Sequence, residues 1–253
     1  ERLPFICELA KAYVGVDPVK EPIPVRPTAH YTMGGIETDG KCATRMPGLY
    51  AAGECASVGL HGANRLGSNS LSEIVVFGKV AGEQAAEFAA TQQHGNTQAL
   101  VAKAEALIKQ HLSLLDIDGT ENPADIRNEL GMSMEAGVGI YRTEELMQGT
   151  IDKINELKAR YKKIKINDKS SVFNTDLLYA IELGYMLDVA EAMAHSAINR
   201  KESRGSHQRL DGYEERDDVN FLKHTLSFYA PEGAPTIDYS DVKITKSQPA
   251  KRV

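Results

Sequence analysis

The stretch from Gly48 to Glu83 constrains the fold of this chain more than any other part of it. It opens with the small apolar run GLYAAG, which predicts a short strand that ends at one carboxylate, Glu54. A Gly-rich polar loop follows and carries a single arginine, Arg65. A long helix is then predicted from Ser70 to about Ala90, with a serine or asparagine as its cap. This order favours an anionic or electron-rich ligand, because the first turn of a helix presents unpaired N–H groups and the positive end of its dipole.

Composition narrows the class of protein. The chain has 253 residues and a formal charge of −6, and acidic residues interleave with its basic ones, which disfavours nucleic-acid binding. Its three cysteines, Cys7, Cys42 and Cys55, have no metal or redox spacing and suit a reducing compartment. No apolar run approaches the roughly 18 residues that a membrane span needs, and no signal peptide is visible. Because the first residue is Glu1 and lies within a helical pattern, we expect a fragment of a longer protein.

The N-terminal part is predicted to be an α/β segment that follows a connector. Residues 1–14 have the pattern of the end of a helix, and several prolines then favour an extended connector. Residues 28–38 predict a strand with a bend at Gly34-Gly35, and Asp39-Gly40 is a hairpin turn signal. The run from Gly48 to Gly53 predicts the next strand.

From about Asn96 the pattern becomes helical. Residues 97–115 carry apolar positions at helical spacing, and Asn122-Pro123 has the cap and the first-position proline of another helix start. Thr143 precedes a further helix, and residues 175–200 are apolar on nearly all sides, which places that helix at the centre of a bundle. We therefore expect antiparallel helices joined by short links. One face of the Thr143 helix is predicted to consist of Leu146, Ile151, Ile154, Leu157, Tyr161 and Ile164.

The C-terminal residues predict a small α+β lobe. The run HTLSFYA at 224–230 and the run DVKITK at 241–246 are both typical of strands. Between the helices and these strands lies the dense charged run RKESRGSHQRLDGYEERDD. This run could line an active site, but interleaved charges favour an ion-paired network that joins two lobes.

Four polar residues of the α/β segment are candidates for a ligand site. Arg65 could clamp a carboxylate or phosphate, since a guanidinium forks onto two oxygens, but it could also be a solvated loop arginine. His30 could orient a carboxylate or polarise a carbonyl, or it could be a core histidine; Tyr31 beside it favours packing. Glu54, at a strand end, could accept a hydrogen bond from a ribose or ribityl hydroxyl, or be an exposed loop acid.

Other chemistries find no support in the pattern. His61 has no second metal ligand near it, and no metal site is predicted. No Ser-His-Asp pattern, phosphate loop or G-x-G-x-x-G fingerprint is present. The residues by themselves therefore predict a site for something anionic and flat, without naming a reaction.

Several long segments resemble the flavoprotein subunit of quinol-linked fumarate reductase, a member of the succinate dehydrogenase and fumarate reductase family. The resemblance runs from end to end of the chain and matches the C-terminal portion of that subunit. Its most specific segments are RPTAHYTMGGI at 26–36, GLYAAGEC at 48–55 and HGANRLGSNSL at 61–71, followed by ESRGSHQR at 202–209 and RDDVNFLKHT at 216–225. Succinate dehydrogenase and L-aspartate oxidase flavoproteins share parts of this pattern and remain the alternatives.

The resemblance implies an FAD-dependent oxidoreductase that reduces fumarate to succinate. It implies that His30 and Arg65 bind the dicarboxylate over the flavin, that Glu54 holds the ribityl chain, and that the backbone N–H groups of Ser70 and Leu71 face the flavin pyrimidine edge. His30, Tyr31 and Arg65 are also expected to line the cofactor site.

The resemblance implies four parts. They are the end of a capping domain with a connector (1–25), the C-terminal part of an FAD-binding domain (26–91), a helical domain (96–200) and a small C-terminal lobe (201–253). In the family, the main dinucleotide motif, the histidine linked covalently to FAD and the proton-delivering arginine belong to segments that do not match this chain. We therefore expect the 253 residues alone to be inactive and not to retain FAD.

The implied partners are an iron–sulfur subunit and membrane anchor subunits, and the implied location is the cytoplasmic face of a bacterial inner membrane in anaerobic respiration. A hypothesis of another class is that the chain is a docking module without activity of its own. Binding of the isolated 96–253 segment to the iron–sulfur subunit would favour that alternative.

Overall fold

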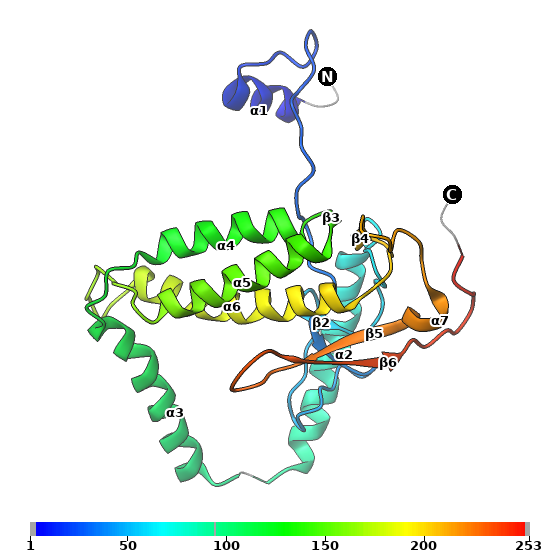
Figure 1. Ribbon diagram of the computed structural model, residues 1–253. Helices are drawn as coiled ribbons and strands as arrows, with labels where there is room; N and C mark the ends of the chain where they lie inside the picture. Colours follow the sequence, from blue (N-terminus) through cyan, green and yellow to red (C-terminus); the bar gives the residue numbers. More distant parts are fainter. Residues whose placement is uncertain (1–3, 94, 251–253) are drawn as a thin grey trace. The chain divides into compact units, whose positions relative to one another are not determined.

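The computed structural model describes residues 4–93 and 95–250 and divides into two compact units, 1–32 and 33–253. The first unit holds helix α1 (Pro4–Val14) and a proline-rich connector without regular structure (Figure 1). Helix α1 ends where Gly15 adopts a left-handed conformation with φ +67°, and the Gly15 N–H donates to the Lys11 carbonyl. The helix is thus confirmed over its described residues; residues 1–3 lie outside them. The boundary at 32/33 differs from the predicted domain boundaries, which stay predictions.

The second unit begins with a small sheet that is shorter than predicted. Strand β1 (Ile36–Glu37) pairs in parallel with β2 (Ala56–Ser57), and no strand is assigned at 28–35. The run 48–53 forms only a bridge between Tyr50 and Ala43. Both predicted strands were therefore too long, because an apolar run becomes a strand only where a neighbour satisfies its backbone groups. The turn at Asp39-Gly40 is confirmed: the Cys42 N–H donates to the Asp39 carbonyl at 3.0 Å.

Helix α2 (Asn69–Thr91) follows the arginine-containing loop, close to its predicted range. Residues 42–53 pack along it, and Tyr50 meets Phe88 edge to face with 6.4 Å between ring centroids. Gly48 is required here, since a Cβ at this position would lie 2.9 Å from the Phe88 ring and its φ is +84°. This contact fixes the segment that leads to Glu54 against the helix.

Three long helices form the main body of the second unit, and their starts are set by local caps. Helices α4 (Pro123–Val138), α5 (Glu144–Tyr161) and α6 (Thr175–Asn199) lie side by side (Figure 1). As predicted, Asn122 caps α4, with its Oδ1 accepting from Ala124 N at 3.0 Å, and Thr143 caps α5, with its Oγ1 accepting from Leu146 N at 3.3 Å. The link from α5 to α6 runs from residue 162 to 174, so the expectation of short links fails there.

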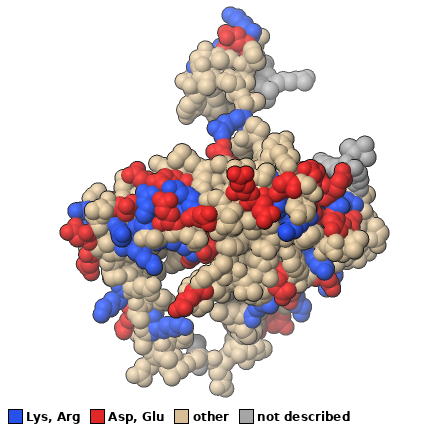
Figure 2. Space-filling model, viewed as in Figure 1, with Lys and Arg blue, Asp and Glu red and all other residues tan. Residues whose placement is uncertain are grey.

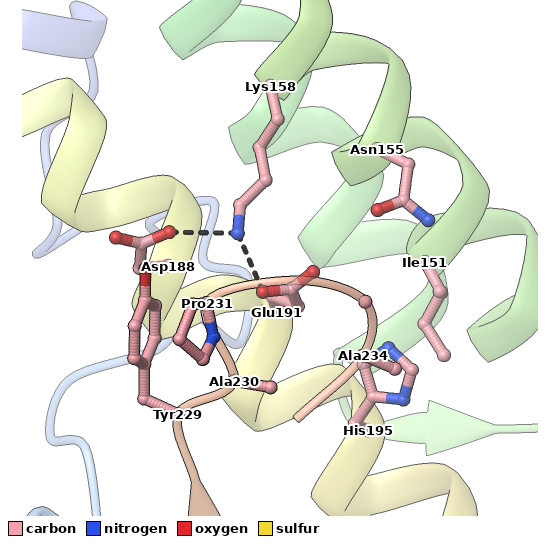
Figure 3. A pocket seen from close by; sticks show the side chains of 11 residues that line it. Ile151, Asn155, Lys158, Asp188, Glu191, His195, Tyr229, Ala230, Pro231 and Ala234 are labelled. Atoms are coloured by element: carbon pink, nitrogen blue, oxygen red, sulfur yellow. Dashed lines mark hydrogen bonds and ion pairs between the residues drawn. The ribbon is translucent and has the colours of Figure 1, made fainter. Parts of the chain in front are cut away.

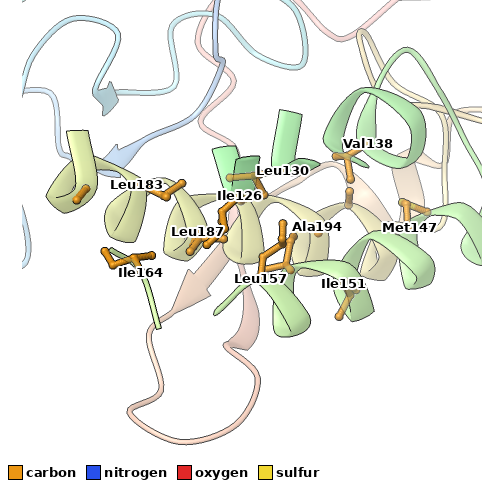
Figure 4. Close-up of a cluster of buried hydrophobic side chains, with 14 of the residues drawn as sticks. Ile126, Leu130, Val138, Met147, Ile151, Leu157, Ile164, Leu183, Leu187 and Ala194 are labelled. Atoms are coloured by element: carbon orange, nitrogen blue, oxygen red, sulfur yellow. The ribbon is translucent and has the colours of Figure 1, made fainter. Parts of the chain in front are cut away.

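The core lies between these three helices (Figure 4). Leu183 and Leu187 of α6 face Ile154 and Leu157 of α5 and Ile126 of α4, all with exposed fractions of 1% or less. Four of the six predicted face residues of α5 and its flank are buried there, namely Ile151, Ile154, Leu157 and Ile164, and Tyr161 packs against them. Leu146 is instead 47% exposed, and Met147 takes the buried position one residue later. The helix is therefore rotated about its axis relative to the predicted face, because tertiary packing decides which side of the helix is buried.

Helix α6 contacts α4, α5 and two C-terminal strands, yet its apolar residues do not all enter the core. Its small side chains face inward, whereas Tyr185, Val189 and Leu178 are more than half exposed. The placement at the bundle centre therefore holds for one face of the helix only. Helix α3 (Thr97–Leu112), continued by the 3₁₀ turn η1 (Ser113–Asp116), has no buried residue in the part of the chain that the structure describes.

The C-terminal lobe contains a hairpin, as predicted, but its second strand lies earlier in the chain. Strand β5 (Lys223–Phe228) pairs antiparallel with β6 (Thr236–Asp241), not with residues 241–246. The loop 229–235 joins the two strands and contains Gly233, whose φ is +82°, and Phe228 pairs with Thr236 where the strands meet this loop. Strands β3 (Tyr141–Arg142) and β4 (Gln208–Arg209) pair in parallel, and a short helix α7 (Asp218–Phe221) precedes β5.

Charges of both signs intermingle on the surface of the bundle (Figure 2). On α5, Arg160 contacts Glu121 and Glu129 at 2.8 Å each, and Lys153 contacts Glu129 at 2.7 Å. The hydrogen bonds from Arg160 and then Lys153 lower the pKa of Glu129 to about 2. Among the described helices, none is both long and apolar enough to cross a bilayer.

Candidate functional site

A tight turn presents Glu54 to solvent. Gly53 has φ +82°, and the Ala56 N–H donates to the Gly53 carbonyl at 2.9 Å, so the chain reverses around Glu54 and Cys55. The Glu54 side chain is exposed next to strand β2. Its carboxylate is therefore accessible to a ligand hydroxyl, as the predicted role requires.

The N-terminus of α2 is exposed, and its first turn contains no acidic residue. Its cap residue Ser68 is left-handed with φ 67° and makes no side-chain cap bond. Gly67, Ser68 and Leu71 are exposed. Of the two predicted cofactor-facing backbone groups, the Leu71 N–H donates to the Ser68 carbonyl at 3.1 Å, while Ser70 is half-buried. The positive end of a 23-residue helix thus meets no carboxylate from its own first turn.

Arg65 lies in a loop between β2 and α2 and is half-buried. One of its terminal nitrogens, Nη1, donates to the Leu66 carbonyl at 3.3 Å. Four residues earlier, the His61 Nε2 lies 2.5 Å from Glu73 Oε2, and both side chains are buried. His61 is therefore part of a buried pair with a carboxylate of α2, and no group of three or more potential metal ligands occurs in the described residues.

A segment from the far end of the chain supports the same loop. The backbone N–H and the hydroxyl of Ser206 both donate to the Ala63 carbonyl at 3.0 Å. Gly205 beside it has φ +60°, and a Cβ there would lie 2.4 Å from the same carbonyl oxygen. The ESRGSHQR segment is thus in contact with the HGANRLGSNSL segment.

The other two predicted site residues lie in the first unit. His30 is exposed and Tyr31 is half-buried, and both lie in the connector before residue 33. Their convergence with Arg65 and Glu54 of the second unit stays a prediction.

The charged run after α6 forms the expected ion-paired network. Glu202 has no exposed surface and accepts five hydrogen bonds of 2.6 to 2.9 Å, from the Arg200 and Arg204 guanidinium groups and the Asp217 N–H. Burial by itself raises the pKa of Glu202, but these bonds outweigh it and the pKa falls below its ordinary value. Arg200 also bonds the Lys223 carbonyl and Thr225 at 3.0 Å, so the network joins the end of α6 to β5.

His207 is the buried histidine of this network. Its Nδ1 lies 2.8 Å from Arg142 Nη1 and its Nε2 lies 3.0 Å from the Arg200 carbonyl oxygen. A guanidinium can only donate, so Nδ1 accepts and Nε2–H donates to the carbonyl, which defines a neutral ring. Burial, together with the charges of Arg142, Arg209 and Arg200, lowers the pKa of His207 to about 4, against the opposite effect of the bond to the carbonyl.

Stability is therefore expected to depend on pH through His207. Its folded-state pKa of about 4 lies below the ordinary 6.5, so the unfolded chain binds the proton more readily. The contribution of the neutral ring is complete above pH 6.5, is lost as pH falls towards 4, and amounts to about 3 kcal/mol over that window. Urea unfolding of wild type and His207→Gln between pH 4 and 7.5 measures it, because a glutamine amide can keep both bonds without titrating.

The expected result is a steeper loss of unfolding free energy in the wild type than in His207→Gln between pH 6.5 and 4. The pKa values of the network carboxylates Glu202 and Asp211 are lowered in both proteins, so the difference between the two profiles isolates His207. Parallel pH profiles for the two proteins would contradict the assignment of a neutral buried ring.

A cavity of about 360 Å³ lies between the bundle and the hairpin loop, away from the loop of Arg65. In the wall of this cavity, the Nζ of Lys158 from α5 lies 2.8 Å from Asp188 Oδ1 and 2.6 Å from Glu191 Oε2, both on α6 (Figure 3). Burial opposes the charge of Lys158, but these two bonds outweigh it and raise its pKa. Two carboxylates thus neutralise the Lys158 cation of this cavity.

Sequence reasoning identified the loop of Arg65 but missed Glu73 and Ser206, which bond it. Glu73 lies in the first turns of α2, where an acid is ordinary, and Ser206 is 143 positions from Ala63. No local pattern pairs residues so far apart. The one signal available in the sequence was that both segments, 61–71 and 202–209, contain glycine, which permits a close approach of two backbones.

Two family models match the chain. The model described as "Fumarate reductase flavoprotein C-term" matches residues 127–253, and the model described as "FAD binding domain" matches residues 1–71. The chain belongs to the fumarate reductase flavoprotein family. The family that the motifs suggested is thereby confirmed, and the matches extend well beyond the motif segments.

Individual members of the family are similar along the whole chain. Fumarate reductase flavoprotein subunits of a Serratia species and of Escherichia coli are 70% and 69% identical over all of it, and a Rickettsia bellii succinate dehydrogenase flavoprotein subunit is 42% identical. The chain spans 42% of the length of the first two and 45% of the third.

Solved structures confirm the fold class. An E. coli quinol fumarate reductase flavoprotein variant matches with a TM-score of 0.96 and 69% identity, over 99% of this chain and 43% of that one. A Mycobacterium smegmatis Sdh1 complex matches with a TM-score of 0.84 and 36% identity, over 96% of this chain and 41% of that one. The predicted combination of an α/β portion of an FAD-binding domain with a helical bundle and a small C-terminal lobe is the fold of this family.

Proposed function

We propose that the chain is the C-terminal part of the catalytic flavoprotein subunit of a quinol-linked fumarate reductase. The supporting observation is the 70% identity to such a subunit along the entire chain, against 42% for a succinate dehydrogenase flavoprotein. In the proposed reaction a hydride adds to one alkene carbon of fumarate and a proton to the other, which gives succinate.

The residues present fit FAD as the cofactor. Glu54 is an exposed carboxylate that can accept from a ribityl hydroxyl, and the α2 N-terminus, whose first turn has no acidic residue, would offer its positive end to an electron-rich ring edge. Bound FAD, in its two-electron reduced form, would supply the hydride and be oxidised in the process. The helix end, near Ser70 and Leu71, would stabilise negative charge on the ring and so favour its reduced state.

Fumarate is proposed to bind through its two carboxylates. Arg65 would hold one carboxylate with its guanidinium, and His30 would hydrogen-bond the other end of the diacid, with Tyr31 at the cofactor side. Two groups on one small substrate restrict its orientation, and Arg65 would oppose the negative charge that builds up as hydride arrives.

The subunit is proposed to act with an iron–sulfur subunit and membrane anchor subunits, which would attach it peripherally to the cytoplasmic face of the bacterial inner membrane. One support is the similarity to a structure described as quinol-fumarate reductase with menaquinol, at a TM-score of 0.94. The exposed helix α3 and the faces of α6 outside the core offer surface for such partners.

Purified full-length subunit containing this sequence tests the function. We expect flavin absorbance and oxidation of reduced viologen on addition of fumarate. Parallel assays with succinate plus an artificial acceptor and with L-aspartate compare the related activities. A protein that oxidises L-aspartate and does not reduce fumarate would contradict the proposal.

A further inference from the structure

The loop that carries Arg65 has no regular structure of its own. Residues 61–67, the arginine loop, form neither helix nor strand, and Gly62 within it has φ +58° with open space around it. A guanidinium on such a loop would sample many positions unless contacts from other elements restrict the backbone that carries it. Its geometry must come from contacts with other elements.

The first such contact holds the start of the arginine loop to helix α2. The His61 ring and the Glu73 carboxylate meet at 2.5 Å, with exposed side-chain fractions of 8% and 1%. Glu73 is the one residue of α2 that is fully buried. A buried carboxylate is costly unless it is bonded, so this pair resists separation and anchors the loop four residues before Arg65.

The second contact holds the middle of the arginine loop to the C-terminal lobe. Ser206 donates twice to the Ala63 carbonyl, and Gly205 allows the two backbones to approach. The turn that presents Ser206 is closed by two backbone bonds between Arg204 and His207, of 2.8 and 3.0 Å. The side chain of Arg204 also bonds the buried Glu202 carboxylate, which restricts the position of this turn.

We propose that His61, Glu73 and Ser206 are positioning residues that hold Arg65 in register with the substrate carboxylate. The inference rests on the proposed function of Arg65. Anchors at positions 61 and 63 leave only Asn64 between the second anchor and the arginine, so little backbone freedom remains. The C-terminal lobe thereby contributes to dicarboxylate binding without touching the substrate.

The test uses Glu73→Gln and Ser206→Ala in the full-length subunit. Each should lower kcat/KM for fumarate by about 10- to 100-fold, since a displacement of about 1 Å at a positioning group has effects of that order. Both should also weaken the binding of malonate, a dicarboxylate that cannot be reduced. Matched controls are Glu156→Gln and Ser170→Ala, whose side chains are exposed and far from the loop in sequence, and which should leave both values unchanged.

A double-mutant cycle separates positioning from a general structural role. If Glu73 and Ser206 act through Arg65, their substitutions should have no further effect on kcat/KM in an Arg65→Gln background. Multiplicative losses in that background would overturn the inference. Should Glu73→Gln fail to fold, as judged by flavin absorbance and circular dichroism, then Ser206→Ala and His61→Gln decide the same question.

The outcomes also distinguish this inference from the proposed function. Unchanged fumarate reduction by Arg65→Gln would remove Arg65 from the substrate site, and the positioning role with it, while the proposed fumarate reductase activity would stand. Absence of fumarate reduction in the wild-type subunit would instead contradict the proposed function. A large loss in Arg65→Gln, with wild-type activity in Glu73→Gln and Ser206→Ala, would overturn the positioning role alone.

Discussion

Replacing Arg65 by glutamine in the full-length subunit is expected to lower kcat/KM for fumarate about 10²- to 10³-fold, the usual effect of removing one donor that stabilises developing charge. The guanidinium is proposed to hold a substrate carboxylate while negative charge increases on the substrate. Glutamine can still donate hydrogen bonds through its NH₂ group but carries no charge. Both ground-state binding and transition-state stabilisation should therefore suffer.

The companion variant Arg65→Lys separates charge from geometry. Lysine keeps the charge but loses the planar fork, so its activity should lie between wild type and Arg65→Gln. Steady-state assays with fumarate and binding titrations with malonate measure the two contributions. Arg45→Gln is a matched control, because Arg45 is an exposed arginine of the same unit that pairs with Glu37. Equal activities of the Arg65 and Arg45 variants would remove Arg65 from the site.

Glu202→Gln is expected to destabilise the chain by about 3 to 5 kcal/mol, which is typical when one partner of a buried ion pair is removed. The carboxylate accepts from two guanidinium groups and one backbone N–H. Glutamine has one carbonyl oxygen and an NH₂ group that cannot accept. The substitution would remove the carboxylate that Arg200 and Arg204, both only 15% exposed, share. Arg204 would keep its contact with Asp218 at 2.6 Å.

Urea unfolding at pH 7 measures the effect, and Glu156→Gln is the control of the same chemistry. Glu156 is 52% exposed and pairs with Lys153, so its substitution should change stability by less than about 0.5 kcal/mol. Since the pKa of Glu202 is lowered in the folded chain, its contribution is present above the ordinary value of about 4.3 and is lost as pH falls. A difference between Glu202→Gln and wild type that does not shrink in acid would contradict the charged assignment.

The helices illustrate what sequence reasoning could reach. Asn122 and Thr143 cap α4 and α5 as predicted, because a cap bond joins residues only two or three positions apart. The start of α2 and the turn at Asp39-Gly40 were likewise local. The strands were less predictable: the run at 48–53 is apolar enough for a strand but finds only one bridge. Whether a strand forms depends on a neighbour, which no window of sequence reveals.

The candidate site shows the same division. Residue types and their order in the chain were enough to predict Glu54, Arg65 and the helix start after them as candidates for a ligand site, since each carries its chemistry within a few residues. Only the tertiary structure decided what holds Arg65: a buried pair between His61 and Glu73, and a serine 143 positions from the carbonyl it bonds. Chemical identity is a property of single residues, whereas positioning depends on contacts between residues that are distant in the chain, and those contacts exist only once the chain has folded.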